Sequence, residues 1–168
     1  MTFSSGQSPA PSNFRYSYAD SFGNTPLKQE GNNEGRLKRF GLSKKERIKS
    51  KKEFDLVYTA GEHLISPSQK LKALYIIDRN SDSAGVKTAY AVSRKAGNAV
   101  WRNRVKRLLR EAFRLNKEQI VNECSNKMIK LLVVFSPYSI NQRNYKKIHL
   151  NDVQKDVVDL MNQIRAKL

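Results

Sequence analysis

The segment from about Asn98 to Asn116 is predicted to form a helix with one buried side and one strongly basic side. Glu111 is its only acidic residue, and nine Lys and Arg residues lie between Ser93 and Lys117. The apolar residues recur at three- and four-residue steps, the spacing that places side chains on one helical face. These apolar residues are Trp101, Val105, Leu108, Ala112 and Leu115. Such a helix needs a protein core on one side and a negatively charged partner on the other.

A basic helix face can also be merely solvated, and many charged helix faces are. Two observations favour a partner here. Solvated faces usually alternate in sign, whereas like charges four residues apart at positions 102, 106, 110 and 114 repel one another in the free protein. Arginine also predominates over lysine, which suits paired hydrogen bonds to phosphate. Phosphate groups would neutralise this face.

The expected start of this helix adds further attraction for anions. Asn98 stands at the N-cap position after Gly97, and the free amides of a helix start attract negative charge. A cap and a turn explain these two residues without any ligand. They do not explain Arg94 and Lys95, which bring positive charge to the same place.

The charge of the whole chain points to the same kind of partner. The sequence has 32 Lys and Arg residues against 15 Asp and Glu residues, a formal net charge of +17. A field of this size attracts polyanions, with nucleic acid the leading partner and an anionic membrane surface the competitor.

Other features of the composition favour a cytoplasmic protein without a membrane span. Cys124 is the only cysteine, which excludes an intramolecular disulfide and a zinc site built from cysteines. No window of 18 apolar residues suggests a membrane helix. The first residues also lack the basic and apolar pattern of a secretory signal.

Residues 1–41 are expected to be a disordered N-terminal extension, and residues 42–168 a single RNA-binding domain. The extension is rich in Ser, Asn, Gly, Pro and Gln, and it shows no apolar period. Its scattered aromatic residues are Phe14, Tyr16, Tyr18 and Phe22. Two interpretations are open: these residues have no role, or they form a docking segment.

The pattern of the domain predicts helices and strands in mixed order. A helix is expected from Ser50 to Gly61, where Ser50 and Glu53 have capping-box spacing; Ser43 and Glu46 share that spacing before a segment too basic to pack. A last helix begins near Leu150, with Asn151 and Gln154 as a further capping box. Between them lie a basic helix and four expected strands, at 64–66, 71–78, 88–93 and 128–135. This order predicts an α+β sandwich in which helices cover one face of a four-stranded sheet and leave the other partly open.

One motif resembles a known family. The string Ala99-Val100-Trp101-Arg102-Asn103-Arg104-Val105-Lys106-Arg107-Leu108-Leu109-Arg110 is similar to the signature of the protein subunit of bacterial ribonuclease P. "AVSRKAGNAV", "RIKSKKEFDLVYTAG" and "LLVVF" extend the similarity. The resemblance implies a two-layer αβββαβα fold with a left-handed βαβ crossover. Three features depart from the family pattern: the extension, a longer segment at 62–70 and the bulky Trp101.

The resemblance also implies partners and site residues. The partners are one catalytic ribonuclease P RNA for each protein, and precursor tRNA, whose 5′ leader is removed; magnesium is bound mainly by the RNA. The implied RNA contacts are Arg94, Lys95, Asn98, Arg102, Asn103, Arg104, Lys106, Arg107 and Arg110. The implied leader-binding cleft contains Phe54, Tyr58, Tyr75 and Lys51. Aromatic side chains can stack on unpaired bases. Packing in the core is the other explanation for Phe54, Tyr58 and Tyr75.

The sequence predicts no catalytic residue and no metal site in the protein itself. His63 and His149 stand in no motif, and Asp78, Asp82 and Asp152 lack the spacing of metal ligands. A ribosomal or general RNA-binding protein is the rival interpretation, and a protein of the membrane surface is a distant third.

Overall fold

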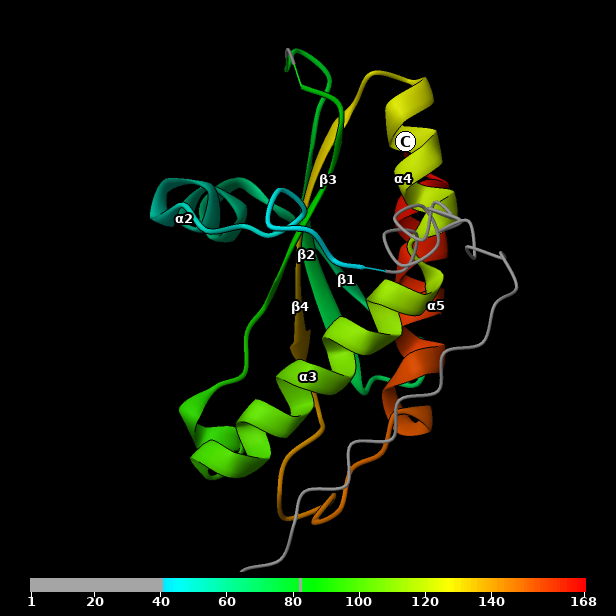
Figure 1. Ribbon diagram of the computed structural model, residues 1–168. Coiled ribbons are helices and arrows are strands. Elements are labelled where there is room, and N and C mark those ends of the chain that lie inside the picture. Colours follow the sequence, from blue (N-terminus) through cyan, green and yellow to red (C-terminus); the bar gives the residue numbers. More distant parts are fainter. Residues whose placement is uncertain (1–40, 82) are drawn as a thin grey trace, which may run out of the picture. The chain divides into compact units, whose positions relative to one another are not determined.

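The computed structural model describes residues 41–81 and 83–168 (Figure 1). The predicted disordered extension therefore lies outside the described residues, apart from Gly41. The elements, in chain order, are α2 (Lys51–Ala60), β1 (Glu62–Ile65), β2 (Leu71–Asp78), β3 (Gly85–Tyr90), the 3-10 helix η1 (Arg94–Ala96), α3 (Ala99–Asn116), α4 (Glu118–Asn126), β4 (Lys130–Pro137) and α5 (Asn151–Arg165). All the expected elements are present, and α4 is an additional helix that the sequence analysis did not anticipate.

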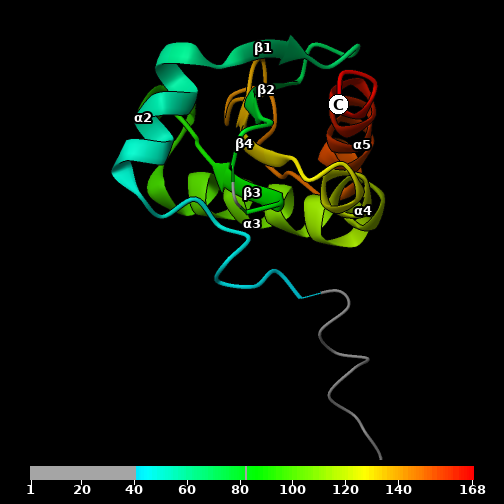
Figure 2. The same ribbon diagram turned by 90° about the horizontal axis from the view of Figure 1, so that it is seen from above.

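The strands form one mixed four-stranded sheet in the order β1-β2-β4-β3. β4 pairs with β2 antiparallel, from Leu71 opposite Pro137 to Asp78 opposite Lys130, and with β3 in parallel. Parallel neighbours require a crossover connection, and α3 and α4 supply it. This crossover is left-handed (Figures 1 and 2), as the resemblance implies and against the usual preference.

Helices lie on both faces of the sheet. Figure 2 shows α4 and α5 on one side of the strands and α2 on the other. The expectation that the helices share one face is therefore right for α3, α4 and α5, which enclose the main core, and wrong for α2. α2 packs through Val57 on a second, smaller cluster with Leu74, Leu132 and Val134. This double cover explains why β4 is an unbroken apolar run: its alternate residues enter different cores.

Neither of the two expected capping boxes forms. Ser50 is the N-cap of α2, but its side chain makes no capping hydrogen bond. Glu53 instead accepts a hydrogen bond from Lys87 Nζ at 2.6 Å, and it lies 3.7 Å from Lys130 Nζ. The two strand lysines offer this carboxylate a full positive charge, which attracts it more strongly than a backbone amide does. In α5 the N-cap is Leu150. There the Asp152 carboxylate accepts from the His149 amide at 2.7 Å.

The reciprocal capping bonds form instead in the turn before α2. The Ser43 amide donates to Glu46 Oε2 at 2.6 Å, and the Glu46 amide donates to Ser43 Oγ at 3.3 Å. No α-helix follows directly. The chain then runs along β3, where the Ile48 amide donates to Thr88 O at 3.0 Å.

A partly buried ion pair fixes this turn to the segment between α3 and α4. Lys117, between α3 and α4, donates to the Glu46 carboxylate and, at 2.6 Å, to Gly41 O. Burial alone would raise the pKa of Glu46, but the bonds from Lys117 and Ser43 outweigh it and hold the pKa below its usual value. The Glu46–Lys117 pair therefore contributes stability when Glu46 is ionised.

We expect Glu46→Gln to reduce the free energy of unfolding by about 1.5–3 kcal/mol at pH 7, the range for a hydrogen bond to a charged group. A depressed folded-state pKa stabilises above the unfolded value and loses that effect as pH falls through the folded value. The difference from the wild type should therefore vanish in acid. Urea unfolding between pH 7 and pH 3 measures it, with Glu118→Gln, an exposed carboxylate, as the control. A difference that does not depend on pH would contradict this assignment.

Candidate nucleic-acid interface

The buried side of α3 is rotated slightly from the predicted one. Trp101, Val105 and Ala112 are buried as expected, but Leu115 is 40% exposed. Leu109 and Phe113 are buried in its place. The helix packs against both α5 and the sheet. The centres of the Phe113 and Phe135 rings are 6.0 Å apart. Because α3 contacts two elements, its buried side extends as far as Phe113.

The first turn of α3 is held in three ways. Asn98 is the N-cap as predicted: its Oδ1 accepts from the Trp101 amide at 2.8 Å. A Cβ at Gly97 would lie 2.8 Å from the Gln142 side chain and 2.9 Å from Trp101 Cε3, so a side chain there would force a shift. Trp101 is 3% exposed and its Nε1 donates to Tyr145 O at 2.8 Å. This tryptophan packs in the protein and is not available to stack on a base.

The structure brings the nine predicted RNA contacts together along η1 and α3. Six are exposed: Arg94, Lys95, Asn98, Asn103, Arg104 and Arg107. Three are half-buried: Arg102, Lys106 and Arg110. We call these nine residues the α3 surface.

Some members of the α3 surface are also engaged with the protein. Arg104 Nε donates to Ile148 O at 2.8 Å. The Arg110 guanidinium lies 5.8 Å from the centre of the Tyr90 ring, and burial raises the pKa of Tyr90 to about 12. Arg107 is exposed on the solvent side, and it is therefore the clearest single test of this surface.

α2 carries three of the four predicted leader contacts on one face. Phe54 and Tyr58 stand one turn apart with ring centres 4.8 Å from each other, and Lys51 lies one turn before Phe54. Phe54 is half-buried against the smaller core, and Tyr58 is 46% exposed. Tyr58 thus has an aromatic surface open to a ligand.

Tyr75 does not join them, and its predicted place in this cleft is corrected. It is 1% exposed and belongs to the main core, on the sheet face opposite α2. Its hydroxyl donates to the Glu62 carboxylate, and Lys167 Nζ lies 5.6 Å from the ring centre. Successive strand residues point to opposite faces, so Leu74 faces α2 and Tyr75 faces α5.

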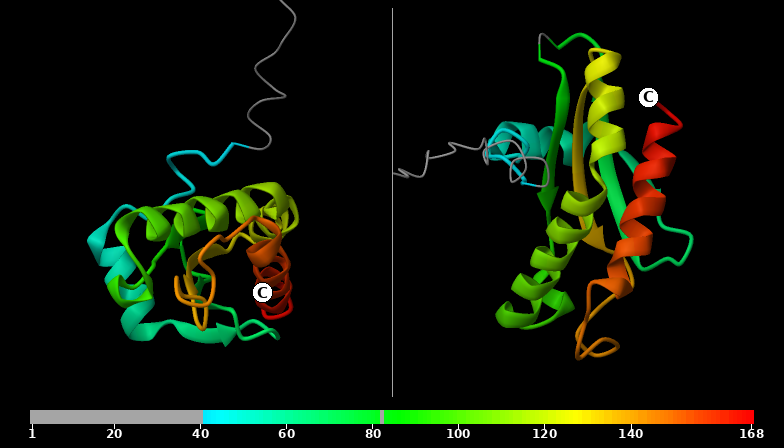
Figure 3. Two further views of the ribbon diagram at one scale, coloured as in Figure 1. Left: turned by 90° about the horizontal axis from the view of Figure 1, so that it is seen from below. Right: turned by 45° about the vertical axis from the view of Figure 1, so that its right-hand side comes forward.

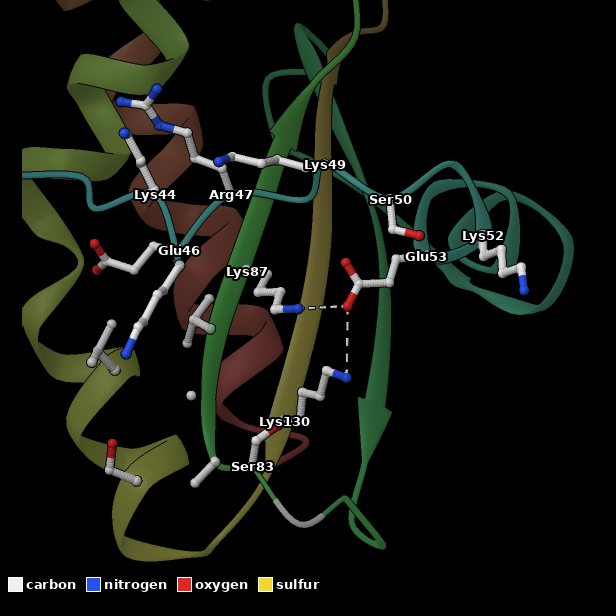
Figure 4. A pocket seen from close by; sticks show the side chains of 16 residues that line it. Lys44, Glu46, Arg47, Lys49, Ser50, Lys52, Glu53, Ser83, Lys87 and Lys130 are labelled. Atoms are coloured by element: carbon white, nitrogen blue, oxygen red, sulfur yellow. Dashed lines mark hydrogen bonds and ion pairs between the residues drawn. The ribbon is translucent and has the colours of Figure 1, made fainter.

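Apart from the α3 surface, a basic concavity lies between the start of α2, the edge of β3 and α4 (Figure 4). Its Lys and Arg residues are Lys44, Lys45, Arg47, Lys49, Lys52, Lys87 and Lys130. Glu53 reaches between Lys87 and Lys130 and neutralises part of their charge (Figure 4). The sequence analysis did not select these residues; the signal was the run of basic residues from Lys44 to Lys52.

The described part of the chain offers no protein metal site and no membrane helix. Within residues 41–81 and 83–168, no group of three or more His, Cys, Asp or Glu side chains could hold a metal ion. Asp82 lies outside this range. No helix among the described residues is long and apolar enough to cross a bilayer.

The fold and the site define a class of protein: an α+β domain with a left-handed crossover, whose crossover helix presents a basic face. Known proteins of this class match the chain. The model of the ribonuclease P protein family matches residues 42–165, and the chain belongs to this family.

Individual relatives show how far the likeness extends. The ribonuclease P protein component of Clostridium botulinum is 34% identical over 122 residues, which cover 71% of this chain and 95% of that protein. The one from Maridesulfovibrio salexigens is 40% identical over 82 residues, or 49% of this chain and 64% of that protein.

Solved structures confirm the fold. The RNase P protein from Thermotoga maritima superimposes with a TM-score of 0.56 and 23% identity, covering 70% of this chain and 96% of that one. The Staphylococcus aureus RNase P protein gives 0.54 and 21%, covering 71% and 95%.

We expect Arg107→Ala to weaken binding to ribonuclease P RNA without unfolding the protein, because the side chain lies outside the core. One lost phosphate contact should reduce the slope of log affinity against log salt by about 0.7–0.9. A titration of labelled RNA at several salt concentrations measures both effects. Lys155→Ala, an exposed lysine of α5, is the matched control. If the two variants behave alike, Arg107 makes no RNA contact.

Proposed function

We propose that this protein is the RNA-binding subunit of a cytoplasmic ribonuclease P holoenzyme that removes the 5′ leader of precursor tRNA. It belongs to the family of protein components of that enzyme, which implies an RNA partner and a role in tRNA 5′ maturation. One protein binds one catalytic RNA through the α3 surface. The leader strand lies against Lys51, Phe54 and Tyr58 of α2.

The α3 surface is the observation that carries the proposal. Nine predicted contacts gather on η1 and α3, while the opposite side of the helix is fixed in the core. Like charges held this close raise the free energy of the unbound protein. Binding an RNA backbone relieves this repulsion and releases counterions, so the surface favours a polyanion over water.

The leader contact is supported by the separation of the aromatic pair from the α3 surface. Phe54 and Tyr58 lie on a helix that covers the other face of the sheet (Figure 2). One RNA can therefore occupy α3 while a second strand meets α2. Stacking on an aromatic ring does not depend on base identity, which suits leaders of varied sequence.

We assign the cleavage step to the RNA and its magnesium ions. The carboxylates of the described residues do not gather into a group that fits a metal ion. His63 and His149 are exposed, on β1 and before α5, and they are far apart in the chain. The protein's own contribution is then to offset phosphate repulsion and to hold the substrate in place, which lowers the barrier through positioning.

Cleavage of precursor tRNA by ribonuclease P RNA at low magnesium, with and without this protein, tests the proposal. The protein should restore cleavage at the mature 5′ end, because its cations replace part of the ionic screening. A general RNA-binding protein would bind ribonuclease P RNA and precursor tRNA without restoring accurate cleavage. That result would contradict the proposed function.

We expect Tyr58→Leu to weaken binding of precursor tRNA to the holoenzyme but not binding of mature tRNA. The loss of one stacked base corresponds to about 1–3 kcal/mol, or roughly five- to a hundredfold in affinity. The ratio of precursor to mature affinity measures it. Tyr75→Phe is the matched control, because Tyr75 is buried on the other face and its ring is retained. If the ratio of precursor to mature tRNA affinity is unchanged in Tyr58→Leu, the leader does not stack on Tyr58 and the proposed contact with α2 is wrong.

A further inference from the structure

The loop that joins β4 to α5 runs beside the start of α3 (Figure 3). Gln142 forms two hydrogen bonds with the turn before α3. Its backbone N–H donates to Ala96 O at 2.7 Å, and its side-chain Oε1 accepts from the backbone N–H of Asn98 at 2.8 Å. Two more hydrogen bonds follow, from Trp101 Nε1 to Tyr145 O and from Arg104 Nε to Ile148 O, both at 2.8 Å. The loop is therefore attached along its length.

These contacts fix which loop residues face away from α3. The attached positions are 142, 145 and 148, three residues apart, and Ile148 is fully buried. The residues between them are exposed, and three are basic: Arg143, Lys146 and Lys147. Since attachment and exposure alternate in this way, the loop presents a row of cations beside the α3 surface.

A hollow lies where this row meets the start of α3. It is lined by Lys95 and Gly97 on the α3 side and by Asn141, Gln142, Arg143 and Lys146 on the loop side. Three cations from two segments face it, and no carboxylate lines it. This differs from the concavity at the start of α2, where Glu46 and Glu53 contribute opposite charge.

We propose that Arg143, Lys146 and Lys147 form a second row of the RNA-binding surface, and that the hollow holds neighbouring phosphate groups of the catalytic RNA backbone. The inference rests on the proposed function and extends its site beyond the signature helix. Because the loop backbone is already fixed by hydrogen bonds, little backbone conformational entropy is lost when its cations bind. The backbone that crosses the hollow belongs to the catalytic RNA, because the hollow adjoins the α3 surface at Lys95.

The double variant Arg143→Ala/Lys146→Ala tests this site, with Lys127→Ala/Lys155→Ala as its matched control. Both remove two exposed lysine or arginine charges, and only the first touches the hollow. Protein affinity for ribonuclease P RNA, and holoenzyme affinity for mature tRNA, are measured over a range of salt. The loop variant should lose about 1.4–1.8 units of salt slope for ribonuclease P RNA, the value expected for two phosphate contacts, and keep its slope for mature tRNA. A loss confined to mature tRNA would contradict the assignment of the hollow to the catalytic RNA.

Equal slopes for the loop variant and its control with ribonuclease P RNA would overturn the inference. Arg143→Gln and Lys146→Gln as single variants keep the test decisive if the double variant is unfolded, and each should lose about half of the effect. The proposed function is judged separately: if the wild-type protein fails to restore cleavage, that proposal fails whatever the loop variants do.

Discussion

The first turn of α3 is held in place by its cap, its tryptophan and the loop after β4, and the basic helix is positioned from there. Asn98 caps the helix, the indole of Trp101 donates to Tyr145 O, and Gly97 permits the close approach of Gln142. These contacts tie the helix to the loop after β4. With its buried side in the main core as well, α3 can hold many like charges on its other side despite their mutual repulsion.

The sheet keeps the two proposed RNA contacts apart. β4 is buried on both faces, so α3 and α5 pack on one side while α2 packs on the other. Glu53 contributes to the placement of α2, since it joins the helix to Lys87 of β3 and Lys130 of β4. In the proposed holoenzyme, the catalytic RNA and the leader therefore meet different faces of one rigid sheet, and neither excludes the other.

The sequence predicted the elements and the basic helix well, because periodicity and charge are local properties. It failed where a distant partner decides. Ser50 and Glu53 have capping-box spacing, but Lys87 and Lys130 draw the carboxylate away. The error at Tyr75 has another origin: the resemblance placed this residue in the leader cleft, whereas the local alternation of strand residues turns it towards α5. Arg143 and Lys146 gave no periodic signal; only their hydrogen-bonded neighbours reveal that they lie beside α3.

Hydroxyl-radical cleavage from tethered iron can show whether the two RNA contacts lie on opposite faces of the sheet. Cys124 is buried, and burial raises the pKa of its thiol to about 11, so a cysteine introduced at the surface is labelled selectively. Val100→Cys places the probe on α3, where Val100 is 80% exposed, and Asp55→Cys places it on the exposed side of α2. In holoenzyme with precursor tRNA, the α3 probe should cut the catalytic RNA and the α2 probe should cut the leader. Cuts in the same RNA segment from both probes, or cuts of the leader from α3 and of the catalytic RNA from α2, would rule out this arrangement.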